Sequence, residues 1–301
     1  MIRCMFCTAG AILGALFIAP AYAQNISIPD FSGTWARQVL DFEQPLSGPG
    51  PVVNRVHRPS GIGSNLQMLV GDYTNPILKP QAAEQVKRLG NLASTNAVFP
   101  DPYNQCLAMP TPYILAMREI QLLQQEDAVT IVYMWDHMVR RVRMNASHPA
   151  HIAPTWQGDS VGYYEGDTLV VDTIGIKPGP FPMVDRFGTP HSGALHVTER
   201  YRLIDHEIAK AINEKYQAEQ GYRVGLGEAL GDGVIVDSNY VGKGLQVQFT
   251  VEDENVFTMP WSGQVTYLRA GGQWLEQSCA ENTRESSGLE RVMPHTETPD
   301  F

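Results

Sequence analysis

The segment from Gly158 to Arg200 holds a dense group of side chains that can do acid–base chemistry. It contains His191 and His196, and Asp172 interrupts the apolar run LVVDT. Histidine titrates near neutral pH and is a natural general acid or base. An ionised carboxylate inside a strand needs a partner. We therefore expect His191 or His196 to transfer protons, with Asp172 orienting the ring. The alternative is structural: His196 satisfied in the core and Asp172 paired with an arginine.

Arginine and further polar side chains on nearby strands are candidates for binding a substrate. In an extended strand alternate residues share a face, so Arg141 and Arg143 lie on one face and Arg140 on the other. Arginine recognises carboxylates and polarised oxygens well, although some of these side chains could simply form a solvated strand face. The expected substrate-binding residues are Arg141, Arg200, Trp135, His137, His148 and Glu165.

Motif spacing argues against several other chemistries. The chain lacks the HExxH or cysteine-rich spacing of common zinc sites, the glycine pattern of dinucleotide or phosphate loops, and a G-x-S-x-G nucleophile turn. We expect no cofactor and no metal. Non-local ligands are invisible to spacing, so zinc held by His148, His191, His196 and Asp172 stays an alternative.

Short β-type runs separated by turns dominate the rest of the chain and predict an antiparallel barrel or sandwich. The candidate strands are 114–123, 128–135, 138–144, 161–164, 168–174, 194–204, 245–251 and 264–270. A short helix is expected over 79–92. Ile208, Ala211, Ile212 and Tyr216 have helical spacing and predict an amphipathic helix. It would belong to an insertion at about 206–244, between two strands, that serves as a lid or a subunit contact.

The first 23 residues have the pattern of a signal peptide, with Arg3, an apolar stretch and the cleavage site Ala21-Tyr22-Ala23. We expect a single β-barrel domain over 24–301 and a periplasmic or secreted protein. In that oxidising setting Cys106 and Cys279 predict a disulfide, with two buried thiols as the alternative.

The charge of the chain limits its partners. The net charge is −10, and the sequence has no basic cluster. We therefore expect neither nucleic acid nor a membrane surface as partner, but a small molecule and possibly a second copy of the chain through the insertion.

Several motifs occur in an order that resembles a known family. These are DFSGTW, GDSVGYYEGDTLVVDT, PHSGALHVTER and SCAEN, and they cover most of the chain after residue 23. The resemblance is to exported bacterial proteins without a general functional assignment. This chain departs from that pattern at Tyr164, where tryptophan is usual, and in the insertion after Asp205. SGTW is also similar to the opening of lipocalin-like barrels, whose tryptophan closes the narrow end. That likeness favours a lipocalin-like barrel over a sandwich and implies an apolar ligand.

These observations favour a cofactor-independent enzyme of the lyase, hydratase or isomerase type. It would act by histidine and aspartate acid–base chemistry on a small apolar or aromatic molecule. The alternative is a non-catalytic periplasmic protein that binds a small apolar ligand in the same pocket.

Overall fold

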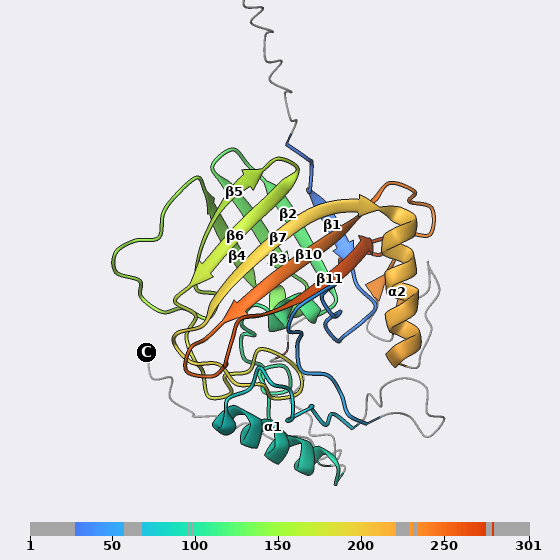
Figure 1. Ribbon diagram of the computed structural model, residues 1–301. Helices are drawn as coiled ribbons and strands as arrows, with labels where there is room; N and C mark the ends of the chain where they lie inside the picture. Colours follow the sequence, from blue (N-terminus) through green and yellow to red (C-terminus); the bar gives the residue numbers. More distant parts are fainter. Residues whose placement is uncertain are drawn as a thin grey trace, which may run out of the picture.

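The computed structural model describes residues 28–56, 68–95, 97, 99–220, 229–230, 234–274 and 279, so the expected signal peptide lies outside the described residues. Nine strands form a closed barrel (Figure 1), which confirms the mainly β barrel predicted from the sequence. In chain order the strands are β1 (Gly33–Ala36), β2 (Glu119–Gln124), β3 (Ala128–Tyr133), β4 (Val139–Met144), β5 (Asp159–Glu165), β6 (Thr168–Ile174), β7 (His196–Asp205), β10 (Lys243–Glu252) and β11 (Trp261–Arg269). Around the barrel they follow the order β1-β11-β10-β7-β6-β5-β4-β3-β2.

One junction of the barrel differs from the antiparallel pattern. β4 and β5 pair in parallel, with Val142 opposite Ser160, while every other pairing in the barrel is antiparallel. Parallel neighbours cannot be joined by a tight hairpin, since the chain must return to the end where the first strand began. The connection 145–158 makes that return, so the barrel is mixed rather than wholly antiparallel.

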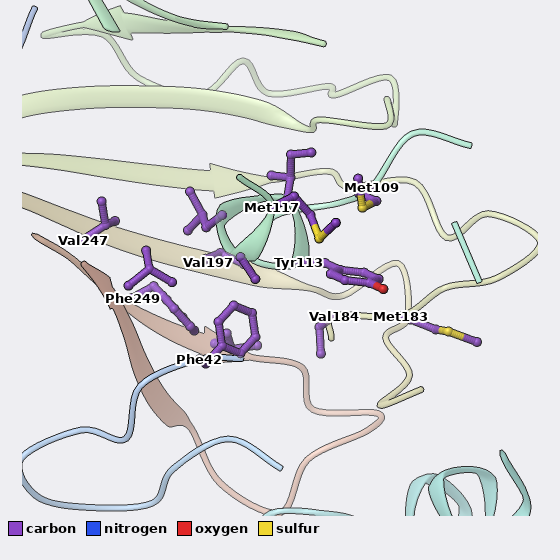
Figure 2. Packing of buried hydrophobic residues seen from close by; sticks show 14 of the residues in the cluster. Phe42, Met109, Tyr113, Met117, Met183, Val184, Val197, Val247 and Phe249 are labelled. Carbon is purple, nitrogen blue, oxygen red and sulfur yellow. The ribbon is translucent and has the colours of Figure 1, made fainter. Parts of the chain in front are cut away.

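Alternating side chains fill the barrel interior. Val197 of β7 and Val247 and Phe249 of β10 are buried and face inward. Figure 2 shows these three beside apolar side chains from the segments that close one end of the barrel, among them Met117 and Tyr113. That end includes the short 3-10 helix η1 (Tyr113–Ala116), where the sequence predicted the beginning of a strand. The core is thus built from strand residues and closing segments together.

The tryptophan of the first strand is held from two sides. Trp35 is buried, its indole N–H donates to the Phe31 carbonyl at 2.9 Å, and the Arg269 guanidinium lies 5.0 Å from its ring centroid. Gly33 has φ +118°, and a Cβ there would sit 2.2 Å from the Arg269 guanidinium. Only glycine permits both that backbone conformation and so close an approach. β1 is thereby locked to the end of β11.

Two helices lie outside the barrel. α1 (Pro80–Ala93) covers segments at one end of the barrel, and α2 (His206–Gln220) packs against β7, β10 and β11 (Figure 1). The described part of the insertion also includes the antiparallel strands β8 (Ala229–Leu230) and β9 (Val234–Ile235). No helix among the described residues is long and apolar enough to cross a membrane.

The predicted helix over the insertion is confirmed, but its buried face is different from the one expected. Ala209 is fully buried against Ala36 and Leu268, whereas Ile208 is 56% exposed. Polar residues complete the buried face, and Gln217 donates to the Gln38 side chain at 2.9 Å. The buried face of α2 therefore consists mainly of small and polar side chains.

The predicted cysteine pair is confirmed. Cys106 and Cys279 form a disulfide with a Cα–Cα distance of 5.3 Å across a sequence separation of 173 residues. It joins a segment that precedes η1 to a residue that follows β11. Such a bridge restricts the unfolded chain far more than a local one would, in the chain-entropy account.

Candidate active site

Asp172 stands at the centre of a hydrogen-bonded network on the outer face of the barrel. Its Oδ1 atom lies 2.7 Å from His196 Nε2, and its Oδ2 atom lies 2.9 Å from His148 Nε2. Thr198 adds a hydroxyl that donates to Oδ1 at 3.2 Å. Each carboxylate oxygen therefore fixes the orientation of one imidazole ring.

The network continues from both histidines. His148 Nδ1 lies 2.6 Å from Asp159 Oδ1, and the same oxygen accepts from Arg143 Nη2 at 2.7 Å. At the other end, His196 Nδ1 lies 3.5 Å from Glu252 Oε2. Acidic and basic groups thus alternate from β4 to β10. Both rings contact a carboxylate through each nitrogen, but the 3.5 Å contact of His196 Nδ1 is the longest of the four, and the His196 side chain is 35% exposed against 18% for His148. His196 Nδ1 is therefore the ring nitrogen better placed to meet a substrate.

The strands place these groups through alternation and register. Val171 and Val197 point into the core, so their neighbours Asp172 and His196 point outward. Asp172 pairs with Thr198 across the β6–β7 ladder, and His196 pairs with Glu252 across β7–β10. His148 comes instead from the connection 145–158, which lies where it does because β4 and β5 are parallel.

Charge pairing shifts the titration of the central pair. The hydrogen bond from His196 makes the largest contribution to lowering the pKa of Asp172, and the bond from His148 acts in the same direction against the opposing effect of partial burial, so that the pKa of Asp172 is about 2. The hydrogen bond to Asp172 raises the pKa of His196, again against partial burial. The Asp172 side chain is 31% exposed and the His196 side chain is 35% exposed. His196 is therefore held towards its protonated form while solvent and small molecules can still reach it.

A groove of about 290 Å³ opens on the same outer face, beside the segment Pro45–Ser47. Its floor residues on β7, β10 and β11 are Thr198, Arg200, Gln248, Thr250, Ser262 and Gln264. Thr198 belongs to both features, since its hydroxyl also donates to Asp172. The groove and the histidine–aspartate network are therefore contiguous.

The second expected catalytic histidine lies apart from this network. His191 is only 4% exposed, and its Nδ1 lies 3.0 Å from the Ser192 carbonyl oxygen. Burial lowers its pKa, while the Ser192 carbonyl and the Asp253 charge act in the opposite direction. Within the described residues it shares no hydrogen bond with His196 or Asp172. The structure thus brings together Asp172, His196 and His148, but not His191.

Of the expected substrate-binding residues, two form a pair near the groove. Arg200 Nη2 lies 2.6 Å from Glu165 Oε2, and both side chains are more than 40% exposed. Arg200 shares the outer face of β7 with His196, because alternate residues of a strand lie on the same side. Its charge is therefore largely satisfied by its neighbour.

Of the remaining expected binding residues, His148 belongs to the network around Asp172, and the other three lie elsewhere. Arg141 pairs with Asp127 at 3.2 Å on an exposed part of the sheet. Trp135 stacks on Tyr103 with ring centroids 4.1 Å apart, and the His137 ring lies 6.4 Å from that of Trp274. None of the three contacts the network around Asp172 in the described part of the chain.

Sequence reasoning did not include Asp159, Arg143 and Glu252 among the site residues. Alternation placed Arg143 on the same strand face as Arg141, but nothing local indicated a carboxylate partner. Glu252 joins the network through cross-strand register alone. A signal for Asp159 existed in its position at the start of a strand, one residue after a glycine turn, yet many such aspartates only cap turns.

A second polar cluster lies inside the barrel. Arg140 Nη2 lies 2.8 Å from Glu199 Oε1 and 3.0 Å from the Tyr201 hydroxyl, and its Nη1 donates to Thr111 Oγ1 at 2.7 Å. Tyr201 also donates to Glu199 at 2.8 Å. All four side chains are almost completely buried. This cluster joins β4, β7 and the segment before η1 across the core.

Neither cluster has the arrangement of a metal centre. In the described part of the chain, no group of three or more histidine, cysteine, aspartate or glutamate side chains is arranged to hold a metal ion. No protein-family model, curated protein or solved structure matches this chain.

Proposed function

We propose that this protein is an enzyme that transfers protons through the Asp172–His196 pair, in a reaction of the lyase, hydratase or isomerase type. The observation that supports this most directly is the 2.7 Å contact between Asp172 Oδ1 and His196 Nε2. A carboxylate bound to one ring nitrogen fixes the tautomer and stabilises the imidazolium, which leaves the other nitrogen to exchange a proton.

The proposed step uses His196 Nδ1. In the protonated ring this nitrogen donates to a leaving or developing negative oxygen of the substrate. The neutral ring then recovers a proton from a substrate C–H bond, directly or through water. Isomerisation returns the proton to the substrate, elimination releases a protonated leaving group, and hydration is the reverse of elimination. Each of these reactions balances without an oxidant or reductant.

Solvent deuterium provides the test. The full chain is incubated in D2O with a panel of small carbonyl and hydroxy compounds, and NMR detects deuterium at carbon or a new product. For an active compound we expect His196→Gln to reduce the rate by about a hundredfold or more, since general acid–base catalysis contributes 10²- to 10⁴-fold. Exposed His151 offers a matched control, and His151→Gln should leave the rate unchanged.

Two outcomes would contradict this proposal. If His196→Gln and Asp172→Asn both turn over an active compound at the rate of the unaltered protein, the proposed pair is not catalytic. The buried His191 would then be the next residue to replace. Saturable binding of a compound without turnover would favour the alternative function, a small-molecule binding protein, for which the adjoining groove provides the supporting observation.

We further propose that the protein works in the periplasm or outside the cell. The signal-like pattern of residues 1–23 supports export, and the Cys106–Cys279 disulfide suits an oxidising compartment. Fractionation of cells that express the full chain tests this. The proposal predicts a shortened, disulfide-bonded protein in the exported fraction, whereas an uncleaved cytoplasmic protein with free thiols would contradict it.

A further inference from the structure

We propose that the groove beside Asp172 and His196 binds a neutral, hydroxyl-rich molecule of the carbohydrate class. This inference rests on the proposed function in one respect, because the bound molecule would be the substrate of that site. It differs from the apolar or aromatic ligand expected from the sequence. The reason lies in the side chains that line the groove.

The floor of the groove consists of two polar rows that run across three strands. In one row Thr198, Thr250 and Ser262 are direct cross-strand neighbours on β7, β10 and β11. In the next row Arg200 and Gln248 are neighbours, followed by Gln264. The strands are about 4.8 Å apart, so the rows present polar groups at regular, short intervals.

Most of these groups can both donate and accept hydrogen bonds. A threonine or serine hydroxyl and a glutamine amide each do so, and so does every hydroxyl of a sugar. Thr250 Oγ1 and Ser262 Oγ lie 3.0 Å apart, so one bond between them leaves further capacity on both oxygens. A ligand with several adjacent hydroxyls matches such a surface better than one with a single acceptor.

The charge of the groove argues against an ionic ligand. Its lining includes no aspartate or glutamate, and its one cation, Arg200, is paired with Glu165 at 2.6 Å. One wall is apolar, formed by Pro45 and by Leu46, which is 94% exposed. A sugar combines a rim of hydroxyls with C–H faces, so the polar floor and the apolar wall suit the two surfaces of one molecule.

The placement of the groove connects binding with chemistry. Thr198 and His196 are two residues apart on β7 and point to the same side, which separates their Cα atoms by about 6.8 Å. A hydroxyl-rich ring over Thr198 and Thr250 would therefore bring its edge near His196 Nδ1. This placement permits His196 to remove a proton from a carbon beside an oxygen or to protonate a leaving hydroxyl.

Binding without turnover tests the inference. Titration calorimetry and ligand-observed NMR are carried out on the full chain with methyl β-D-glucoside and cellobiose, and with acetophenone and benzoate as apolar and anionic comparison compounds. We expect at least one sugar to bind more tightly than either comparison compound. Thr250→Val, which removes one hydroxyl at nearly constant shape, should weaken that binding by roughly three- to tenfold, the range expected for one hydrogen bond.

Two variants make the result specific. Thr130→Val makes the same change on the outer face of β3, away from the groove, and should leave sugar binding unchanged. His196→Gln should retain sugar binding even if it abolishes turnover, so that failure of the proposed chemistry and failure of this inference are separable. The inference is overturned if neither sugar saturates the protein, if acetophenone or benzoate binds more tightly, or if Thr250→Val binds sugar as the unaltered protein does.

Discussion

Two polar clusters that share strand β7 differ in their exposure to solvent. Arg140, Glu199 and Tyr201 face the interior and are almost completely buried, whereas Asp172 and His196 face outward and keep about a third of their side-chain surface exposed. Glu199 is only three residues from His196 along β7. On its inner face β7 contributes Glu199 to a buried ion pair with Arg140. On its outer face it contributes His196 to the partly exposed pair with Asp172.

The comparison shows how burial divides structural from chemical roles. Inside the barrel, burial and the Glu199 charge raise the pKa of Tyr201, so its phenol stays neutral and keeps donating a hydrogen bond. The interior groups bind three segments together through buried hydrogen bonds. Outside, the hydrogen bond to Asp172 raises the pKa of His196 while solvent still reaches the ring. Only the outer pair can exchange protons with a molecule that arrives from solution.

The largest effect should come from breaking the inner ion pair. Glu199→Ala leaves the Arg140 charge buried without its carboxylate, which should lower the free energy of unfolding by about 3–5 kcal/mol in urea titrations. Arg140→Met combined with Glu199→Leu should recover much of this loss, because no unpaired charge remains. A loss below about 1 kcal/mol for Glu199→Ala would show that the cluster is not structural.

Loss of the Asp172 carboxylate should lower the free energy of unfolding by less than loss of the Glu199 carboxylate. The pKa of Asp172 falls from 3.8 to about 2, equivalent to roughly 2.4 kcal/mol before screening and about 1–2 kcal/mol for a partly exposed group. A lowered pKa stabilises the fold above the unfolded value near 3.8, and this contribution disappears as the pH falls towards 2. Asp172→Asn should therefore be less stable than the unaltered protein at pH 7, and the gap should narrow below pH 4. A gap that does not depend on pH would contradict the ion-pair account.

The two histidines should give opposite and smaller pH effects. The raised pKa of His196 stabilises the fold fully below about pH 6.5, and that contribution is lost as the pH rises through the folded value. The lowered pKa of His191 destabilises the fold at low pH, and this destabilisation disappears as the pH rises to about 6.5. Stability curves of His196→Gln and His191→Gln, each subtracted from the parent curve, should slope in opposite directions. Equal slopes would show that the two rings have similar surroundings.

The smallest effect should come from a hydroxyl in the core that makes only a weak contact. The Tyr133 hydroxyl is buried beside Thr111, in a geometry that falls short of a full hydrogen bond. Tyr133→Phe removes this hydroxyl and loses at most that weak contact, so the free energy of unfolding should change by less than about 1 kcal/mol. Thermal unfolding measures it. A marked loss of stability would mean that the hydroxyl makes an essential contact.

Local patterns in the sequence were enough to predict most elements. Alternation placed Arg140 on one face of β4 and Arg141 with Arg143 on the other. Short β-type runs predicted β5 and β6, and the cysteine pair predicted the disulfide. These features depend on periodicity over a few residues or on simple pairing, which a single sequence contains.

Which residues come together in the site depends on long-range contacts that no local sequence pattern predicts. His148 reaches Asp172 because β4 and β5 are parallel and the connection between them returns along the barrel. His191 lies only five residues before His196, yet it is buried in a different environment. Likewise α2 buries Ala209 rather than Ile208, because the surface beneath it decides which face is complementary.

The sequence by itself therefore determined which side chains share a face of each strand, since that follows from a repeat of two residues. The tertiary structure decided which of those side chains meet. Cross-strand register and strand direction are set by barrel closure and by the total apolar surface buried, and both involve residues far apart in the chain. For this reason Asp172 could be selected from its position in an apolar strand, while its partners Thr198 and His148 emerged only when the barrel was closed.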